Sequence, residues 1–146
     1  MKKKVIIVIA EDDAGHAKLI KKNIRRAGFY NEIKHFTDGE QTLDYFLGDK
    51  SDISSHDHVL LLDIRMPKID GITVLSKLRQ NLQQIKIPVI IITTTDDPHE
   101  IKKCYKLGCN SYLVKPIEYG NFVEAFNQTG LFPTSANKEA SKKANT

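Results

Sequence analysis

Four separated segments of the chain carry, at or just after their ends, side chains that could take part in phosphoryl chemistry. Glu11 and Asp12 directly follow one apolar run, and Asp63 ends a second. Thr93 ends a third run and Lys115 a fourth. If these runs are parallel strands of one sheet, the carboxylates, the hydroxyl and the ammonium meet at the carboxyl edge of that sheet. Such a set suits the transfer of a phosphoryl group onto an aspartate.

The three carboxylates predict a hard divalent metal. Carboxylates that lie close together repel one another unless a cation is present. Mg²⁺ prefers oxygen ligands in octahedral geometry and usually keeps several waters. Asp12, Asp63, one backbone carbonyl from the loop after Asp63 and water would fill that shell, with Glu11 acting through a bound water. Asp13 fits better as an ordinary acid at a helix N-terminus, which the helix dipole favours.

Asp63 is the candidate nucleophile, because a carboxylate at the end of a buried strand can form an acyl phosphate. Thr93 could donate its hydroxyl to a phosphoryl oxygen. Lys115 could pair with such an oxygen or, in the empty site, with Asp63. Pro116 allows a cis Lys–Pro bond that would aim the lysine inward. Each residue alone has an ordinary structural reading, so the prediction depends on their occurrence together and in order.

Five strands are predicted from runs at fairly even intervals, over residues 5–10, 32–36, 58–63, 88–93 and 111–114. Three of these runs are nearly continuous in Val, Ile and Leu, which is typical of strands buried on both faces of a parallel sheet. The second run is more polar, with Lys34 and His35, and suits the edge of a sheet.

Helical patterns fill the gaps between these runs, each with one apolar face. Thr37 and Glu40 have the spacing of a capping box and would begin the second helix. Asp97 followed by Pro98 is a strong start for the fourth helix, and Gly108 would end it. The expected apolar faces are Ala17, Ile20, Ile24 and Ala27 in the first helix, Leu43 and Phe46 in the second, Ile72, Leu75, Leu78 and Leu82 in the third, and Phe122, Val123 and Phe126 in a fifth that begins near Glu118.

Strands that alternate with helices predict an α/β fold: a flavodoxin-like, doubly wound sheet of five parallel strands in the order 2-1-3-4-5, with five helices. Right-handed crossovers would place helices on both faces. Ligands of such sheets bind outside the carboxyl ends of the strands, where all the candidate residues lie. Residues 1–130 are expected to form this domain, and residues 131–146, which lack apolar periodicity, a mobile tail.

Composition limits the other classes of function. The 146 residues are 40% hydrophobic and 27% charged, as expected for one domain with its own core. No segment approaches the ~20 apolar residues of a membrane span, so we expect a cytoplasmic protein without membrane contact. The net charge of +4 is spread along the chain without a nucleic-acid-binding motif, which favours a solvated surface over nucleic acid. The two cysteines are expected as free thiols, and the five histidines lack metal-binding spacing.

Four segments resemble, in order, the receiver domain of two-component response regulators. They are IIVIAEDD at residues 6–13, LDIRMPKIDG at 62–71, PVIIITT at 88–94 and YLVKP at 112–116, and the resemblance runs from about residue 4 to residue 130. The long loop before the third strand, the Thr93–Thr94 pair and residues 122–132 are similar to single-domain regulators that partner phytochrome-type histidine kinases.

The resemblance implies that Asp63 accepts a phosphoryl group from a phosphohistidine of a sensor histidine kinase. Glu11, Asp12, Asp63 and the backbone carbonyl of Arg65 would hold Mg²⁺. Slow autodephosphorylation is expected, which makes the protein a signalling switch and not an enzyme with turnover.

The resemblance also implies a switch. Thr93 and Lys115 would contact the phosphoryl group, and Tyr112 would turn inward as Thr93 moves. The face made by the fourth helix, fifth strand and fifth helix would then change its preference for partners or for a homodimer. Arg65 and Thr94 are less usual at their positions and would border the phosphoryl group.

Three alternatives remain. The protein could be a phosphorelay intermediate that passes its phosphoryl group to a histidine phosphotransfer protein. A phosphatase with an Asp nucleophile commonly has a second Asp two residues further on, where this chain has Arg65, a poor proton donor. A nucleotide- or flavin-binding module needs a phosphate cradle after the first strand, where Glu11, Asp12 and Asp13 would repel a phosphate.

Overall fold

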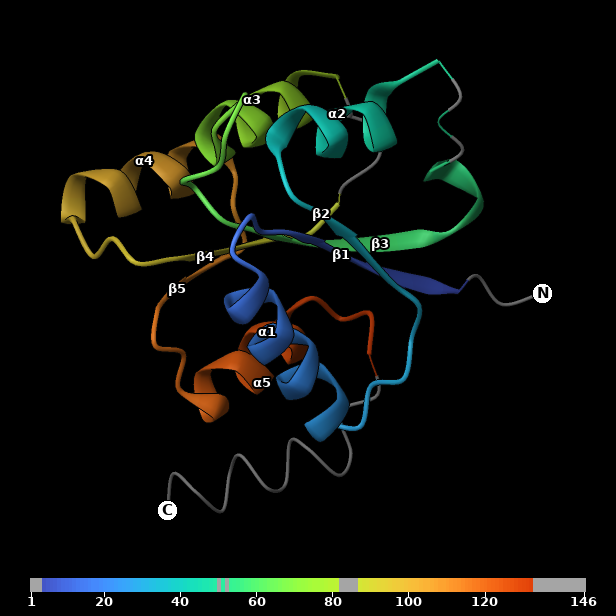
Figure 1. The fold of residues 1–146 in the computed structure, drawn as a ribbon, viewed down its shortest axis with the longest axis vertical. Helices are drawn as coiled ribbons and strands as arrows, with labels where there is room; N and C mark the ends of the chain where they lie inside the picture. The colour runs from blue at the N-terminus through green and yellow to red at the C-terminus, as the bar shows by residue number, and fades with distance from the viewer. Residues whose placement is uncertain (1–3, 50, 52, 82–86, 133–146) are drawn as a thin grey trace.

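Five parallel strands form one sheet in the order β2-β1-β3-β4-β5 (Figure 1). The structure is a computed structural model that describes residues 4–49, 51, 53–81 and 87–132. The strands are β1 (Val5–Ala10), β2 (Ile33–Phe36), β3 (Asp57–Leu62), β4 (Val89–Thr93) and β5 (Ser111–Val114). The predicted strand order and the edge position of the second strand are confirmed, and every strand boundary lies within one residue of its prediction.

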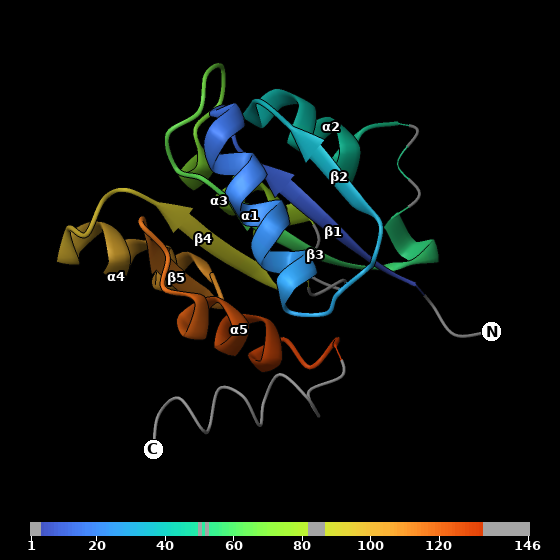
Figure 2. The ribbon, with the colours of Figure 1, turned by 60° about the horizontal axis from the view of Figure 1, so that its bottom comes forward.

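Helices cover both faces of the sheet (Figures 1 and 2). On one face lie α1 (Ala14–Arg26) and α5 (Tyr119–Gln128), and on the other lie α2 (Gly39–Leu47), α3 (Gly71–Asn81) and α4 (Pro98–Leu107). A short 3₁₀-helix, η1 (Ile53–Ser55), precedes β3. The core is therefore two apolar layers, to which successive residues of a strand contribute alternately. This need for apolar side chains on both faces explains the continuous Val, Ile and Leu runs.

The register of the strands brings the candidate residues to one edge of the sheet. Ala10 at the end of β1 pairs with Leu62 at the end of β3, and the Asp63 N–H donates to the Ala10 carbonyl over 3.0 Å. The Lys115 N–H donates to the Thr93 carbonyl over 2.8 Å, which aligns the ends of β4 and β5. The residues that follow these strands therefore leave the sheet side by side.

The start of α2 differs from the prediction. Asp38, and not Thr37, caps this helix, because its carboxylate accepts a hydrogen bond from the Gln41 N–H over 2.8 Å. The predicted pairing with Glu40 is thus wrong by one residue. Both residues are good caps, and packing decides between them: a Cβ on Gly39 would lie 2.0 Å from a carbonyl oxygen of the loop after β3. Glycine is therefore required at position 39, where the helix begins.

The buried face of α3 also differs in part. Leu75 and Leu78 are buried as predicted, but Val74 joins them and Ile72 is only half-buried. Leu82 lies outside the described residues.

The predicted ends of α4 are confirmed. Asp97 accepts a hydrogen bond from the His99 N–H over 3.0 Å, and Gly108 has the left-handed φ of 103° that favours glycine at a helix end. The remaining predicted apolar faces are buried as expected.

The chain remains part of the core beyond Gly130. Phe132 is only 6% exposed, and its ring centroid lies 4.7 Å from that of Phe29 and 5.1 Å from that of Phe126. Leu131 packs against the same layer. Leu131 and Phe132, which were expected in the tail, thus belong to the core layer that contains α1 and α5. Residues 133–146 lie outside the described part of the chain.

The cysteines match their prediction. Cys104 and Cys109 are both free and buried. Burial raises the pKa of the Cys109 thiol to about 12, so this thiol stays protonated and unreactive at neutral pH. In the described ranges, no helix has the length and apolar character needed to cross a membrane.

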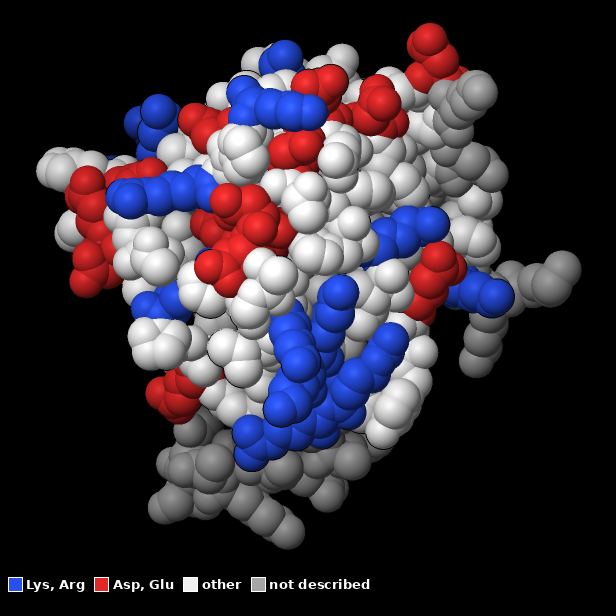
Figure 3. Space-filling model, in the orientation of Figure 1, with Lys and Arg blue, Asp and Glu red and all other residues white. Residues whose placement is uncertain are grey.

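Basic charge is less evenly spread than the sequence suggested. The helix α1 carries five cations and no acid, and these side chains gather on one face of the molecule (Figure 3). They are Lys18, Lys21, Lys22, Arg25 and Arg26. Two of these cations are engaged locally: Arg25 donates to the Phe29 and Asn31 carbonyls, and Arg26 lies over the ring of Tyr119.

Candidate functional site

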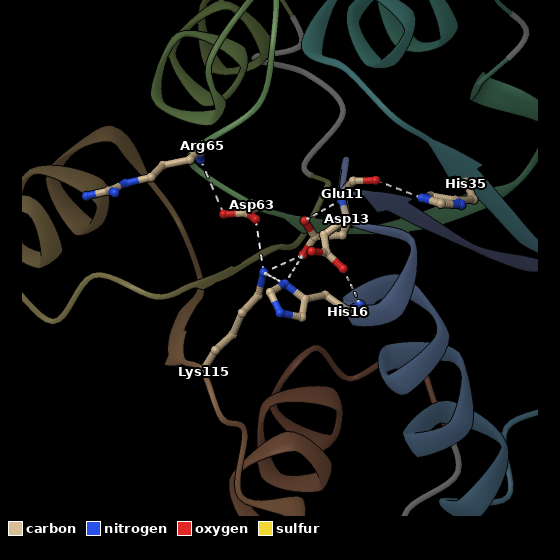
Figure 4. Close-up of polar contacts among 7 residues, drawn as sticks. All are labelled: Glu11, Asp13, His16, His35, Asp63, Arg65 and Lys115. Carbon is tan, nitrogen blue, oxygen red and sulfur yellow. Dashed lines mark hydrogen bonds and ion pairs between the residues drawn. The ribbon is translucent and has the colours of Figure 1, made fainter.

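Four of the predicted residues meet at the carboxyl edge of the sheet. Glu11, Asp12 and Asp63 each present a carboxylate oxygen, and these oxygens lie within 4.8 Å of one another. Lys115 donates from Nζ to Asp63 Oδ2 over 3.0 Å and to Glu11 Oε1 (Figure 4). The side chains of Glu11, Asp63 and Lys115 are 1%, 8% and 10% exposed, whereas Asp12 is open to solvent. The Lys115–Pro116 bond is cis, as the sequence suggested.

The turn after β1 separates the roles of three consecutive acids. Asp13 caps α1 by accepting a hydrogen bond from the His16 N–H over 2.9 Å, and this bond lowers the pKa of the Asp13 carboxyl. The Asp13 N–H donates to Glu11 Oε2 over 3.3 Å and so helps to hold that carboxylate toward the sheet. Asp13 is therefore a helix cap, as predicted, and not a member of the carboxylate cluster.

The loop after β3 holds Asp63 through its backbone. The Arg65 N–H donates to Asp63 Oδ1 over 3.3 Å, and the Gly71 N–H donates to the Ile64 carbonyl over 2.7 Å. A Cβ on Gly71 would lie 2.1 Å from the Asp63 carbonyl oxygen, so this close approach requires glycine. The Arg65 side chain is exposed and points away from Asp63 and Lys115 (Figure 4).

Thr93 lies at the end of β4 with its hydroxyl unused. The residue is 0% exposed, and its Oγ1 has no hydrogen-bond partner among the described residues. A buried, unpaired hydroxyl costs about 1–3 kcal/mol of stability. The site therefore keeps a donor that the resting protein does not satisfy, which is the property expected of a group that meets an incoming anion.

Tyr112 is linked to the loop that follows Thr93. Its hydroxyl donates to the Thr95 carbonyl over 2.9 Å, and the side chain is half-buried. Burial raises the pKa of the Tyr112 phenol, so the group remains a neutral donor. Movement of Thr93 and the adjoining loop would thus act directly on the hydrogen bond of this aromatic residue.

The cluster holds more negative than positive charge. Burial, followed by a hydrogen bond with Asp63, raises the pKa of Glu11 to about 7, although the hydrogen bond from Lys115 opposes the change. Burial lowers the pKa of Lys115, but hydrogen bonds to Glu11 and Asp63 outweigh it and the net direction is upward. The ammonium therefore stays charged, and the remaining carboxylate repulsion can be relieved by a proton or by another cation.

Two histidines that the sequence analysis did not connect to the site contact it from opposite sides. His16 Nδ1 lies 3.0 Å from Lys115 Nζ, and His35 Nε2 lies 2.8 Å from the Glu11 carbonyl oxygen (Figure 4). His16 and Lys115 are 99 positions apart in the chain, so no local spacing could have related them.

The profile of the response regulator receiver domain matches residues 7–127 of the chain. The chain belongs to this family. The resemblance inferred from the four sequence segments is thereby confirmed, and so is the fold that it implied.

Solved structures agree with this family. A response regulator receiver domain from Rhodospirillum rubrum is 48% identical, with a TM-score of 0.70 over 87% of this chain and 92% of that one. The bacteriophytochrome response regulator AtBRR is 27% identical, with a TM-score of 0.74 over 94% of this chain and 99% of that one. The Mn²⁺-bound form of the response regulator Rcp1 is 27% identical, with a TM-score of 0.66 over 77% of this chain and 81% of that one.

Proposed function

We propose that the protein is a response regulator that accepts a phosphoryl group on Asp63 and thereby switches its partner or dimer preference. The observation that carries this proposal is the contact between Lys115 and Asp63 inside a buried carboxylate cluster. Around this contact the proposed nucleophile, a cation and two further acids lie close together. The neighbouring strand β4 adds the Thr93 hydroxyl, which has no hydrogen-bond partner in the described part of the chain.

We assign Mg²⁺ to Glu11, Asp12, Asp63 and the backbone carbonyl of Arg65. The donor set fits a hard cation, because carboxylate and carbonyl oxygens are the ligands such ions prefer. Burial, with a smaller contribution from the nearby Asp63, raises the pKa of Glu11. A cation bound among these carboxylates would favour their charged forms. The Mn²⁺-bound form of Rcp1 supports a divalent ion in a relative. When bound, the metal would neutralise charge on the phosphoryl oxygens.

In the proposed reaction an Asp63 carboxylate oxygen attacks the phosphorus of a phosphohistidine. The new O–P bond forms as the P–N bond breaks, and the histidine keeps the electron pair. Lys115, which already donates to Asp63, turns its hydrogen bond to a phosphoryl oxygen. The Thr93 hydroxyl donates to another such oxygen and so gains a partner, which it lacks among the described residues of the resting protein.

The output follows from the link between Thr93 and Tyr112. When Thr93 and its loop move, the hydrogen bond from Tyr112 to the Thr95 carbonyl is released, and the ring can turn inward. This movement biases a pre-existing equilibrium of the α4–β5–α5 face. Tyr105 on α4 and Val114 on β5 are 49% and 37% exposed, and they offer apolar surface to a second copy of the chain.

We infer a phytochrome-type sensor histidine kinase as the phosphodonor, because of the similarity to AtBRR. Transfer onward to a histidine phosphotransfer protein is the alternative output. We place the exchange in the cytoplasm, a compartment to which the reduced state of Cys104 and Cys109 is suited.

The test is the intact mass of the protein after incubation with acetyl phosphate and Mg²⁺. The parent should gain one phosphoryl group, and Asp63→Asn should gain none. Asp13→Asn, which keeps a good helix cap beside the site, is the matched control and should react like the parent. Equal phosphate uptake by Asp63→Asn would show that another residue is the acceptor.

The output is tested separately by measuring the mass of the particle in solution with and without a phosphate mimic. A shift from monomer to dimer supports the homodimer. Unchanged mass together with transfer of phosphate to a histidine phosphotransfer protein would favour the relay.

A further inference from the structure

The ammonium of Lys115 has three acceptors around it. They are Glu11 Oε1, Asp63 Oδ2 at 3.0 Å and His16 Nδ1 at 3.0 Å. A lysine ammonium has three N–H donors and no acceptor, so these three contacts use its full capacity. The contact with His16 is a hydrogen bond only if Nδ1 carries a lone pair, which assigns the ring proton of the neutral imidazole to Nε2.

Among the described residues, the ring of His16 makes its hydrogen-bond contact with the cluster through Lys115. Its Nδ1 lies 3.9 Å from Glu11 Oε1, which is beyond hydrogen-bond distance. The ring projects from the first turn of α1, toward Lys115 Nζ and on the other side of it from Asp63 (Figure 4). The Asp13 cap fixes that turn, because the Asp13 carboxylate accepts from the His16 N–H itself. The backbone of His16 is therefore held in place by Asp13, and its ring nitrogen Nδ1 faces Lys115 Nζ.

We propose that His16 is a positioning residue that keeps the Lys115 ammonium directed at Asp63 during phosphoryl acceptance. This inference rests on the proposed function. Two of the three acceptors change during the proposed reaction: Glu11 and Asp63 belong to the carboxylate cluster assigned to the metal, and Asp63 also becomes the phosphorylated group. His16 lies outside that cluster, so its lone pair is the acceptor that stays the same throughout.

This role predicts a specific order among substitutions. His16→Leu removes the acceptor and should slow phosphoryl acceptance roughly three- to tenfold, the scale of one partly exposed hydrogen bond to a charged group. His16→Asn should recover most of the rate, because its Oδ1 is attached to Cγ as Nδ1 is in histidine. His16→Gln carries its amide one bond further from the backbone, and we expect it to resemble His16→Leu.

The experiment measures the rate of phosphorylation of the full chain by acetyl phosphate at saturating Mg²⁺, for the parent and these three variants. Lys18→Ala, an exposed change on the same helix, is the control and should match the parent. The same His16→Leu change is then made in a Lys115→Met background. If His16 acts through Lys115, it should have no further effect there. An equal slowing in both backgrounds would overturn the proposal.

A second readout does not depend on phosphorylation. The ring ¹⁵N shifts of His16 distinguish its two neutral tautomers, and the parent should show the proton on Nε2. Lys115→Met should relax this preference. A proton on Nδ1 in the parent would contradict the proposal.

The proposed function and the role of His16 can fail separately. If Asp63 is not phosphorylated at all, the proposed function fails. If Asp63 is phosphorylated and His16→Leu reacts as fast as the parent, only the role of His16 fails.

Discussion

The Lys115 ammonium lies 3.0 Å from the Asp63 carboxylate, although the two residues are 52 positions apart in the chain. They follow β5 and β3, which are separated in the sheet by β4. The lysine side chain therefore reaches across the end of β4, where Thr93 lies with its buried hydroxyl. A cation in this position both neutralises Asp63 in the resting protein and competes with any metal for the same oxygens.

This competition predicts opposite effects of Lys115→Met on two properties. Phosphate uptake from acetyl phosphate should slow by at least tenfold, because the hydrogen bond to the phosphoryl oxygen is lost. Mg²⁺ affinity should rise, because the ammonium no longer shares the oxygens of Glu11 and Asp63. Titration calorimetry with Mg²⁺ measures the second effect. A weaker affinity in Lys115→Met would show that the lysine supports the metal site instead of competing with it.

Thr93→Val should stabilise the resting protein. Valine has the same shape as threonine but removes a buried hydroxyl that has no partner within the described ranges, so the free energy of unfolding should rise by about 1 kcal/mol. The gain should disappear when a phosphate mimic is bound, because the parent hydroxyl then has an acceptor. Denaturant unfolding with and without the mimic measures both values, and Thr93→Ser, which keeps the hydroxyl, is the control. Destabilisation of the resting protein would mean that the hydroxyl has a partner.

Gly71→Ala should disturb the acceptor from outside the site. The new Cβ would lie 2.1 Å from the Asp63 carbonyl oxygen, so the backbone must shift at a cost of about 1–3 kcal/mol or more. Gly120→Ala in α5 is the matched control. The nearest atom to its new Cβ would be Glu118 Oε1, at the ordinary contact distance of 3.6 Å. There alanine should stabilise by up to ~1 kcal/mol. Thermal unfolding compares the two, and equal melting temperatures would argue against a close contact at Gly71.

The strands and the residues at their ends could be predicted because the position and burial of each strand follow from local runs of apolar residues. Continuous apolar runs end where the chain leaves the sheet, so Asp63 and Lys115 were predictable as neighbours once the strands were taken as parallel. The start of α2 was not, because Thr37 and Asp38 are comparable caps and the packing of Gly39 selects between them.

Contacts that depend on how a helix sits on the sheet could not be predicted. The hydrogen bond between His16 and Lys115 requires the first turn of α1 to lie beside the end of β5. The exposed side chain of Arg65 can adopt several rotamers, and sequence does not say that it points away from Asp63. In these cases the missing information is the relative placement of elements and rotamers, which periodicity does not contain.

The raised pKa of Glu11 makes stability depend on pH. Burial and the hydrogen bond with Asp63 raise this pKa from 4.5 to about 7. Between these two values the folded protein binds more protons than the unfolded chain, so the free energy of unfolding falls as pH rises from 4.5 to about 7 and levels off above. A bound Mg²⁺ would favour the charged carboxylate of Glu11 and so offset this fall.

Mg²⁺ should therefore raise the melting temperature more at pH 8 than at pH 5. At the lower pH, protons compete with the metal for the carboxylates. Thermal unfolding at both pH values, with and without Mg²⁺, measures the difference. Glu11→Gln should flatten the pH dependence of the metal-free protein. The same Mg²⁺ shift at both pH values would argue against a metal site that includes Glu11.

Phe132→Ala tests where the folded domain ends. The ring of Phe132 lies against those of Phe29 and Phe126, and the residue is 6% exposed. Truncation of a buried aromatic side chain typically costs 3–5 kcal/mol, and a position near the end of the described core can relax, so we expect about 2–4 kcal/mol. Tyr30→Ala, which truncates an aromatic residue that is 77% exposed, is the control and should cost less than about 0.5 kcal/mol.

Urea unfolding of both variants measures these values, and the dependence of the free energy on urea should be unchanged. A large loss in Phe132→Ala would mean that the cooperative unit extends past Gly130, because Phe132, which follows α5, packs against the aromatic side chains of this core layer. A loss as small as that of Tyr30→Ala would instead return the boundary to residue 130. The two outcomes lead to different choices of chain length for the phosphorylation experiments. A chain cut at residue 130 would lack Leu131 and Phe132, which pack against this core layer.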